Sequence, residues 1–412
     1  MAIDLALFPD PLLRDLAREH GTPLYVYSAE GIRRRVDELA GFDVVRYAQK
    51  ANSNLAVLEY LRDRGCVVDA VSAGEVIRAL RAGFEAREIV YTADLFDRAA
   101  LALVARFPVE VNCGSEFMLE QLARVRAGAR VTLRVNPGFG HGHDRKVSTG
   151  GEQSKHGIWH TELPRALDRA RALGLVAHGL HVHIGSGSDL ENLDRVRGAV
   201  LELAPRFGPA LERVSIGGGL PVPYREGEPR IDVARFTRAW VETKRALETR
   251  LARTIELEVE PGRYLVAEAG VLVAEVRGEK RSGSVRYVLV DAGFHNLVRP
   301  AMYGAHHRIT AIGKTGEQTP AVVAGPLCES ADVFTQSRGE LEPQLLPEFA
   351  EGDLLRIHDA GAYGMSMASN YNSQPFAPEV FVEGGRARLV RRRQTIEELL
   401  ALETLEPGNA EA

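Results

Sequence analysis

Short, nearly continuous apolar runs alternate with helical patterns along residues 44–263. The stretches between the runs place apolar residues at helical spacing, as at Leu55, Leu58 and Leu61. Runs so rich in Val, Ile and Leu are typical of strands that are buried on both faces of a parallel sheet. The pattern predicts eight strands, at residues 44–50, 66–71, 89–93, 109–112, 130–136, 179–185, 213–217 and 255–260.

Eight strands that alternate with helices over roughly 220 residues predict an α/β fold, a TIM-like (β/α)8 barrel. A doubly wound sheet is the alternative, but the count of eight and the polar residues at the strand ends favour the barrel. One connection, residues 137–160, is unusually long and rich in Gly and polar residues. We expect this loop to be functional or mobile and to lie over the mouth of the barrel.

After residue 264 the helical signals become sparse, and strand-like runs follow one another between Gly and Pro residues. This pattern predicts a second, mostly antiparallel β domain, which the strand-like segment Leu24–Tyr27 joins. The domains expected are therefore an N-terminal segment (1–28) that joins the β domain, the barrel (29–264) and the β domain itself (265–412), with Glu406–Ala412 frayed. The strand-like runs are Val271–Val276, Arg286–Val290, Ala321–Ala324, Leu354–His358 and Glu379–Val382.

The composition narrows the class of protein. The 412 residues carry 51 basic and 56 acidic side chains, a formal charge of −5, and no basic cluster, which argues against a nucleic-acid partner. No apolar window is long enough to span a membrane, and the N-terminus lacks the features of a signal peptide. Three widely spaced cysteines do not form the pattern of a disulfide framework or a zinc site. We therefore expect a soluble cytoplasmic protein.

Lys50 is the first candidate for chemistry. Only six of the 51 basic residues are lysines, and this one ends a strand-like run inside an apolar stretch. A buried lysine loses solvation, its pKa falls, and its free amine can act as a nucleophile or form a Schiff base. The alternative is a lysine whose stem lies on the surface while its ammonium group reaches water.

Other polar residues stand at the strand ends, where barrels build their active sites. Gly217, Gly218 and Gly219 follow a strand directly, and their backbone could approach a phosphate closely; a tight turn without a ligand is the alternative. His181 and His183 lie two apart on one strand, but no third metal ligand is obvious nearby. The remaining candidates are Asp69, Arg134, Ser186, Glu260 and Arg263.

Three of these candidates point to a planar, phosphorylated ligand. His183, followed by Ile-Gly-Ser, fits a ring stacked on such a ligand, with Ser186 near its phosphate; a packed structural histidine is the alternative. Glu260 could hold a pyridine nitrogen protonated, or it could form an ordinary ion pair with an arginine. No metal site is predicted, because the loop histidines lack an acidic cluster and are interpreted as solvated: His141, His143, His306 and His307.

Together these residues match the needs of pyridoxal 5′-phosphate (PLP): a lysine for the aldehyde, a stacking ring, a phosphate cradle and a partner for the pyridine nitrogen. On longer motifs the chain resembles the fold-type III PLP-dependent decarboxylases, whose barrel and β domain are alanine-racemase-like, and most closely the branch that decarboxylates diaminopimelate. The motifs are FDVVRYAQKANSN (42–54), DAVSAGE (69–75), LRVNPGFGHGH (133–143), SKHGIW (154–159), HVHIGSG (181–187), GGGLPVPY (217–224), EPGRYLV (260–266), DAGFHNLVRPAMYG (291–304), AGPLCESADVF (324–334) and AGAYGMSMASNYNSQP (360–375).

The resemblance implies a role for each site residue. Lys50 would bind the PLP aldehyde covalently, and Cys328 would donate the proton that replaces CO2. The same resemblance implies a homodimer, because the Cys-Glu-Ser segment would reach the active site of the neighbouring subunit. The cofactor would be held by Lys50, His183, Ser186, Gly217, Gly218, Gly219, Glu260, Pro261, Gly262, Arg263 and Tyr363, and the substrate by Arg263, Arg299, Tyr303, Glu329 and Tyr363.

The substrate implied is meso-2,6-diaminopimelate, and the product is L-lysine. Its distal end carries a carboxylate and an ammonium, which Arg263 and Arg299 on one side and Glu329 on the other can match. Before the resemblance, a surface ion pair is the simpler interpretation of Arg299. Other readings are a related decarboxylase for another amino acid, a racemase, or a non-catalytic PLP-binding protein. One departure from the family is Ala331, which stands where the family usually has Gly and would be strained if that position has a positive φ.

Overall fold

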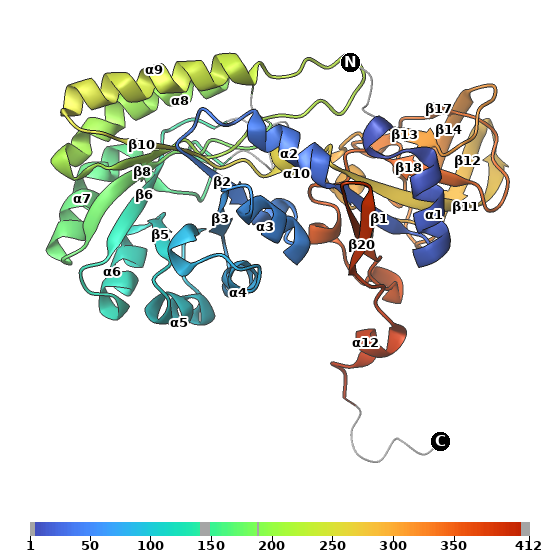
Figure 1. Cartoon of the computed structure of the whole chain (residues 1–412), viewed down its shortest axis with the longest axis horizontal. Coiled ribbons are helices and arrows are strands. Elements are labelled where there is room, and N and C mark those ends of the chain that lie inside the picture. Colours follow the sequence, from blue (N-terminus) through green and yellow to red (C-terminus); the bar gives the residue numbers. More distant parts are fainter. Residues whose placement is uncertain (1–4, 141–148, 188, 405–412) are drawn as a thin grey trace. The chain divides into compact units, whose positions relative to one another are not determined.

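The computed structural model describes residues 5–140, 149–187 and 189–404. The chain divides into two compact units, which Figure 1 shows in the colours of the sequence. The barrel unit comprises Gly31–Pro223 and Glu228–Val266, and the β unit comprises Met1–Glu30, Tyr224–Gly227 and Ala267–Ala412. The β unit is thus assembled from both ends of the chain and from a short segment within the barrel sequence.

The barrel unit contains eight strands in one parallel sheet, close to their predicted places. The sixth strand, predicted at 179–185, is β8 at Val176–His181, so the prediction that His181 and His183 share a strand is wrong: His183 lies just beyond it. The sheet closes on itself because β5 pairs with β6, so the alternative of an open doubly wound sheet is wrong. A two-residue strand, β7 (Ile158–Trp159), extends the edge of β6. The eight strands are β2 (Val44–Ala48), β3 (Val67–Ala70), β4 (Ile89–Ala93), β5 (Glu110–Cys113), β6 (Arg130–Asn136), β8 (Val176–His181), β9 (Arg213–Ser215) and β10 (Glu256–Val259).

Helices follow the strands and begin at polar capping residues. Asn54, Ser72, Asp97 and Asp189 each accept a hydrogen bond from a backbone N–H in the first turn of the helix that follows. Such caps satisfy donors that have no partner inside the helix, so the chain turns from strand to helix at defined residues. The helices are α2 (Ala29–Asp37), α3 (Leu55–Arg62), α4 (Ala73–Arg81), α5 (Arg98–Arg106), α6 (Glu116–Val125), α7 (Leu163–Ala172), α8 (Leu190–Leu203), α9 (Val233–Leu251) and the short α10 (Arg263–Val266).

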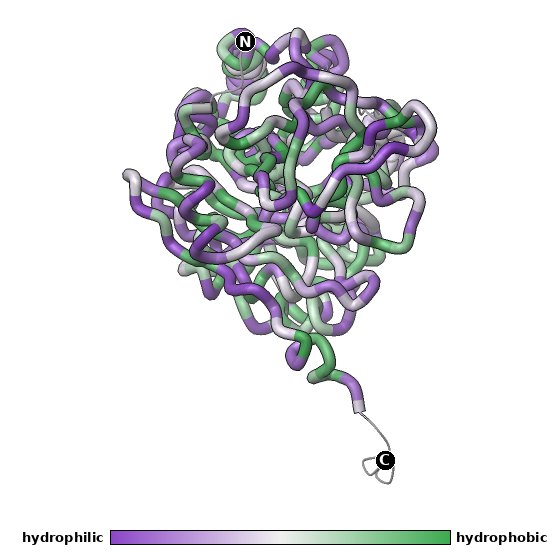
Figure 2. The backbone as a smooth tube through the Cα atoms, turned by 90° about the vertical axis from the view of Figure 1, so that its right-hand side faces the viewer, coloured by the Kyte–Doolittle hydropathy of each residue, from purple (hydrophilic) through white to green (hydrophobic). Residues whose placement is uncertain are grey.

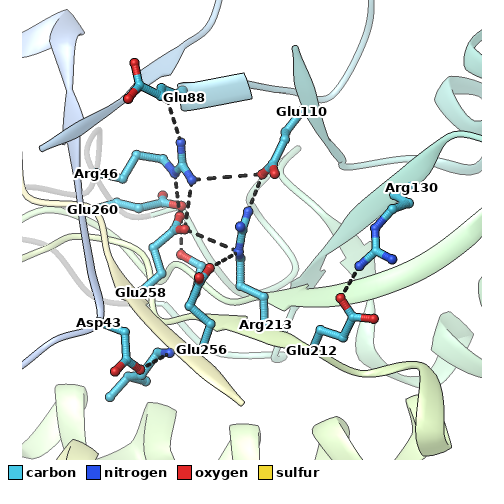
Figure 3. A network of polar contacts seen from close by, with 12 residues as sticks. Asp43, Arg46, Glu88, Glu110, Arg130, Glu212, Arg213, Glu256, Glu258 and Glu260 are labelled. Carbon is cyan, nitrogen blue, oxygen red and sulfur yellow. Dashed lines mark hydrogen bonds and ion pairs between the residues drawn. The ribbon is translucent and has the colours of Figure 1, made fainter. Parts of the chain in front are cut away.

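A network of charged side chains fills part of the barrel interior (Figure 3). Arg46 of β2 donates from Nε and Nη2 to the two carboxylate oxygens of Glu258 of β10, at 2.6 and 2.9 Å. Arg213 of β9 pairs with Glu256 at 2.6 Å and also with Glu110 of β5. Because Arg46 and Glu258 are each only 2% exposed, this two-bond pair links the first and last strands of the barrel where water cannot replace it.

The β unit is built on one sheet with the strand order β17-β14-β12-β11-β1-β19-β20, to which β18 adds beside β11 and β13 beside β18. Most neighbours are antiparallel, but β1 pairs in parallel with β19 and β12 with β14. β1 lies between β11 and β19 in this sheet. The strands are β1 (Leu24–Ser28), β11 (Gly270–Ser282), β12 (Val285–Val290), β13 (Ile309–Ala311), β14 (Thr319–Ala324), β15 (Gln336–Ser337), β16 (Glu340–Leu341), β17 (Gln344–Leu346), β18 (Leu354–Ile357), β19 (Glu379–Glu383) and β20 (Arg386–Arg391).

Helix α1 (Asp10–His20) covers an apolar cluster on this sheet. Leu13 and Leu16 of the helix pack with Val26 of β1, Val273 of β11 and Val380 of β19, all of them buried. Burying side chains of this size is worth about 1.5–3 kcal/mol each. The helix and the central strands therefore form one core.

Helix α12 (Ile396–Leu400) is less well covered than the rest of the β unit. It lies apart from the sheet, and Figure 2 shows a hydrophobic stretch of backbone there. Ile396 and Leu400 are exposed, and Leu402 is 94% exposed. Residues Glu406–Ala412, which the sequence predicted to be frayed, lie outside the described residues.

Candidate active site

The predicted site residues of the barrel unit gather at the carboxyl ends of its strands. Lys50 lies just after β2, in a 3-10 turn (Gln49–Ala51), and Asp69 and Arg134 lie on β3 and β6. The prediction that Lys50 is buried is wrong. Lys50 is exposed, because it stands on the turn beyond the strand end and not within the strand.

Acidic groups surround the position of Lys50. Asp69 is buried, and burial together with the charge of Glu260 raises its pKa to about 7, although a hydrogen bond from Thr92 and the charge of Lys50 oppose the shift. Burial also raises the pKa of Glu75, although the Glu75 carboxylate accepts a bond from the Val71 N–H at 2.8 Å. The sequence analysis missed Glu75 as a site residue, although it closes the motif at 69–75, because it lies in the first turn of α4 and not at a strand end.

The three glycines after β9 form a cradle that side chains would fill. Gly217 has φ +67° and Gly219 has φ +105°, which L-residues rarely adopt. A Cβ atom at Gly217 would lie 2.6 Å from Cβ of His183, and one at Gly218 would lie 2.4 Å from the carbonyl oxygen of Glu260. Glycine is therefore required there, as it is where a backbone must approach a phosphate closely.

His183 packs against this cradle. The N–H of Gly218 donates to Nδ1 of His183 at 3.2 Å, so this nitrogen carries no proton. Burial, followed by the charges of Arg134 and Lys50, lowers the pKa of His183 well below its usual value. The imidazole is therefore neutral, and it offers a ring face and not a charge to a ligand.

Arg263 and Ser186 meet beside the cradle. Arg263 opens α10, is buried, and donates from Nη2 to the hydroxyl of Ser186 at 3.2 Å. A Cβ at Gly262 would lie 3.0 Å from the carbonyl oxygen of Ala48, so glycine lets the Pro261–Gly262 turn pack against the end of β2. These contacts set the guanidinium group and the hydroxyl on the same side of the site.

Glu260 is held by two side chains. His181 Nε2 lies 2.8 Å from one carboxylate oxygen, and the hydroxyl of Ser215 donates to the other at 2.7 Å. Burial favours the neutral acid, but His181, Ser215 and Arg46 outweigh it, and the pKa of Glu260 is lowered. The site thus contains a buried, ionised carboxylate, as a pyridinium partner must be.

Arg299 opens α11 (Arg299–Tyr303) of the β unit, and it is 1% exposed, so the interpretation as a surface ion pair is wrong. Its Nη1 lies 2.8 Å from Nε2 of His307, whose Nδ1 lies 2.8 Å from the carbonyl oxygen of His358. The Tyr224 ring centre is 4.6 Å from the guanidinium carbon. His307, which the sequence predicted to be solvated, is buried where it contacts Arg299. Tyr303, at the other end of α11, is half-buried.

The segment Cys328–Glu329 is exposed, and two side chains hold it. The N–H of Cys328 donates to Oδ1 of Asn372 at 3.0 Å, and the hydroxyl of Tyr371 donates to Glu329. Asn372 has φ +52°, and Tyr363, elsewhere in the same motif, has φ +57° and is half-buried. The sequence analysis missed Tyr371 and Asn372, although both lie within the motif at 360–375.

Ala331 does not have the positive φ that would strain it. It is absent from the non-glycine residues with positive φ in the described chain. Its neighbour Asp332 is buried and accepts bonds from the N–H groups of Leu327 and Phe294, at 2.8 and 2.6 Å. Asp332 therefore fixes the loop, and alanine fits it without a left-handed conformation.

The long loop between β6 and β7 begins and ends at the mouth of the barrel. Asn136, at the end of β6, binds both arms of the loop: Oδ1 accepts from Gly138 and Gly151, and Nδ2 donates to the carbonyl oxygens of Gly151 and His156. Asp94, after β4, contacts His156 and accepts from the N–H of Gly157 at 2.9 Å. Residues 141–148, with His141 and His143, lie outside the described residues.

Two absences hold for residues 5–140, 149–187 and 189–404. No cluster of three or more His, Cys, Asp or Glu side chains there is arranged to hold a metal ion. No helix in these ranges combines the length and apolar character that crossing a membrane requires. His306 lies 4.0 Å from Glu342.

The known proteins that this chain resembles are PLP-dependent decarboxylases. The pyridoxal-binding domain of the pyridoxal-dependent decarboxylases matches residues 30–267. The diaminopimelate decarboxylase of Escherichia coli (strain K12) is 52% identical over 413 residues, 98% of each chain. A crystal structure of diaminopimelate decarboxylase superposes with a TM-score of 0.93 at 50% identity, covering 97% of this chain and 98% of that one. The Helicobacter pylori enzyme complexed with L-lysine gives a TM-score of 0.86 at 31% identity, covering 95% and 98%.

Proposed function

The chain belongs to the pyridoxal-dependent decarboxylases, and we propose from this premise how its own residues divide the work. The reaction is the decarboxylation of meso-2,6-diaminopimelate to L-lysine and CO2, the last step of bacterial lysine biosynthesis, and the cofactor is PLP. The observation that carries this conclusion is identity of about half over nearly the full length with relatives of that activity.

The strand-end residues fit the cofactor, and we propose one role for each group. Lys50 binds the aldehyde, the His183 ring stacks on the pyridine, and Glu260 accepts the pyridine N–H. The glycine cradle and the Ser186 hydroxyl hold the phosphate, since the backbone N–H groups of glycines in such a turn can approach an anion closely. The remaining contacts are Pro261, Gly262, Arg263 and Tyr363.

PLP, when bound, supplies an electron sink for the pair of electrons that the departing CO2 leaves behind. Glu260 keeps its negative charge next to the pyridine nitrogen, because His181 and Ser215 donate to it. The neutral ring of His183 places no competing charge there. Cys328 then donates a proton to the carbon that has lost CO2, and a thiol is suited to this step because it can act as a general acid.

We propose that Arg263 and Arg299 bind the carboxylates of diaminopimelate, that Glu329 accepts the distal ammonium, and that Tyr303 and Tyr363 complete the contacts. A guanidinium can bind a carboxylate with two parallel hydrogen bonds. The buried position of Arg299 supports its role, because His307 and Tyr224 fix the group in one orientation. Lysine and ornithine carry only an ammonium group at the distal end, so an arginine placed there would repel them.

A homodimer completes the proposal. Cys328 and Glu329 are exposed at positions fixed by Asn372 and Tyr371, as residues that serve the active site of a second subunit would be. In this division the N-terminal segment (1–28) and residues 265–412 supply substrate and subunit contacts, while residues 29–264 bind the cofactor. We also propose a cytoplasmic location, which the three free thiols support, since disulfides are rare there.

The test of the reaction is direct. Purified protein with PLP is incubated separately with meso-diaminopimelate, L-lysine and L-ornithine, and the CO2 released is measured. We expect release from meso-diaminopimelate at least about 100-fold faster than from the other two, because only this substrate offers a distal carboxylate. Preferential release from lysine or ornithine would overturn the substrate assignment and leave the cofactor assignment standing.

A further inference from the structure

Three polar side chains meet where three neighbouring strands of the barrel end. His181 is the last residue of β8, Ser215 is the last of β9, and Glu260 follows β10 directly. In the parallel register His181 stands beside Ser215, and Ser215 beside Glu258. The strand pairing therefore brings the three side chains into one layer, in which His181 and Ser215 are each 1% exposed.

The hydrogen bonds in this layer have only one possible direction. An ionised carboxylate accepts and does not donate, so both Ser215 and His181 must be donors. The proton of His181 therefore resides on Nε2, the nitrogen 2.8 Å from Glu260. One donor on each carboxylate oxygen fixes the plane of the carboxylate and leaves a lone pair on each oxygen for a further donor.

The opposite side of the His181 ring shows what determines its orientation. Nδ1 is buried and has no hydrogen-bond partner among the described residues. A buried polar atom without a partner is uncommon and calls for a reason. Here the ring keeps the bond to Glu260 while its other nitrogen stays unsatisfied, so contact with the carboxylate has set the orientation.

We propose that His181 is a positioning residue that keeps Glu260 ionised and aimed, and that it thereby sets the protonation state of the cofactor's pyridine nitrogen. Ser215 is the second donor in the same role. The inference rests on the proposed function, in which Glu260 is the partner of that nitrogen. His181 and His183 lie two residues apart and thus have different roles. His181 acts on Glu260, and His183 acts on the ring face of the cofactor.

Other charged groups also act on Glu260, and the test must separate them from His181. They are Arg46 of β2, Asp69 of β3, Arg134 of β6 and the His183 ring. These four groups keep their side chains when His181 is replaced, although the effect of His181 on the His183 ring is lost. A shift in the titration of the pyridine nitrogen that follows replacement of His181 alone, and returns with a new donor at that position, therefore belongs to the His181–Glu260 bond.

The experiment uses the holoenzyme reconstituted with PLP that carries 15N in the pyridine ring. The nitrogen chemical shift reports its protonation directly, between about pH 6 and 9. We expect the nitrogen to stay protonated over this range in the wild type and to lose its proton within it in His181→Phe. We also expect kcat to fall roughly 10- to 100-fold while KM changes less than about threefold, since substrate contacts are unchanged.

Three further variants make the result specific. His181→Gln restores an N–H donor near the same place and should recover most of the nitrogen titration and of kcat. Ser215→Ala should shift the titration in the same direction as His181→Phe. His178→Phe removes another buried histidine of β8, one whose charged neighbours are Arg130, Arg213, Glu110 and Glu212 and do not include Glu260, and should leave the nitrogen unchanged.

The outcomes separate this inference from the proposed function. A nitrogen that stays protonated in His181→Phe, with wild-type kcat, overturns the role of His181. If Glu260→Gln also leaves the nitrogen protonated, the role of Glu260 is overturned as well. If circular dichroism shows that His181→Phe does not fold, His181→Gln is compared with Ser215→Ala instead. A wild-type titration of the pyridine nitrogen in Ser215→Ala then refutes the positioning of Glu260 by these donors.

Discussion

At the scale of single residues, surroundings decide what each side chain can do. Lys50 is exposed on a turn, and its nearest influences are the acids Asp69 and Glu75. Arg299 is the reverse case, a charged group almost without exposure whose orientation a histidine fixes. Residue type suggested the chemistry of both positions, but burial and neighbours differ from what their type indicated.

Replacement of Lys50 by alanine should abolish both the visible absorbance band of the bound cofactor and the release of CO2. In the proposed function the amine at this position binds the aldehyde, so the covalent link cannot form without it. Absorbance spectra and a CO2 assay on purified protein measure the two effects. Lys280→Ala, an exposed lysine of β11, is the matched control and should retain both. A persistent band in the Lys50 variant would refute the assignment.

Arg299→Met should raise KM for meso-diaminopimelate by roughly 30- to 100-fold, the worth of a charge-assisted two-bond contact, and change the affinity for PLP less than threefold. Steady-state kinetics and a cofactor titration separate the two quantities. Arg308→Met removes an arginine that lies 3.5 Å from Glu226 in the same unit, and should leave KM unchanged. Equal losses of substrate and cofactor affinity in Arg299→Met would remove it from the distal end of the substrate.

At the scale of elements, the register between paired strands brings together side chains that lie far apart in the sequence. The eight barrel strands could be found in the sequence because parallel strands buried on both faces read as continuous apolar runs. The short strands β13, β15, β16 and β17 could not, since two or three residues carry no period. Glu260 was found at a strand end, but its donors His181 and Ser215 come from two other strands, and only the pairing of those strands brings the three together.

The two-bond pair between β2 and β10 leads to a prediction for the barrel. Arg46→Met leaves Glu258 as a buried charge without its main partner and should lower the free energy of unfolding by about 3–5 kcal/mol. The double variant Arg46→Met/Glu258→Leu removes both charges and should recover most of that loss. Denaturant unfolding measures the difference. Arg171→Met, which removes an exposed pair with Asp168, should stay within about 0.5 kcal/mol; a similar loss in that control would contradict the explanation by burial.

At the scale of the whole molecule, the proposed sharing of active sites between subunits predicts that two inactive variants restore activity when they form a mixed dimer. Lys50→Ala and Cys328→Ala should each be inactive alone, whether as purified protein or after refolding. When the two are mixed under conditions in which subunits exchange, activity should return to about a quarter of the wild-type value, because half of the dimers are mixed and each of these has one intact site of two.

The control for this mixture is Cys66→Ala in place of Cys328→Ala, since Cys66 is buried within the barrel unit and its thiol has a pKa raised to about 12 by burial. That variant should be active by itself before any mixing. The mixture of Lys50→Ala with Cys328→Ala is measured at concentrations where size-exclusion chromatography shows a dimer. If it regains no activity, each active site is confined to one chain.

The position of β1 in the β unit has a consequence for biosynthesis. This strand lies between β11 and β19, so its two neighbours are encoded some 240 and 350 residues downstream of it. As the polypeptide leaves the ribosome, every strand of the barrel emerges before either neighbour of β1 exists. The nascent chain must therefore carry an apolar strand with both edges open through most of translation, and chaperone binding during that interval would be expected to centre on it.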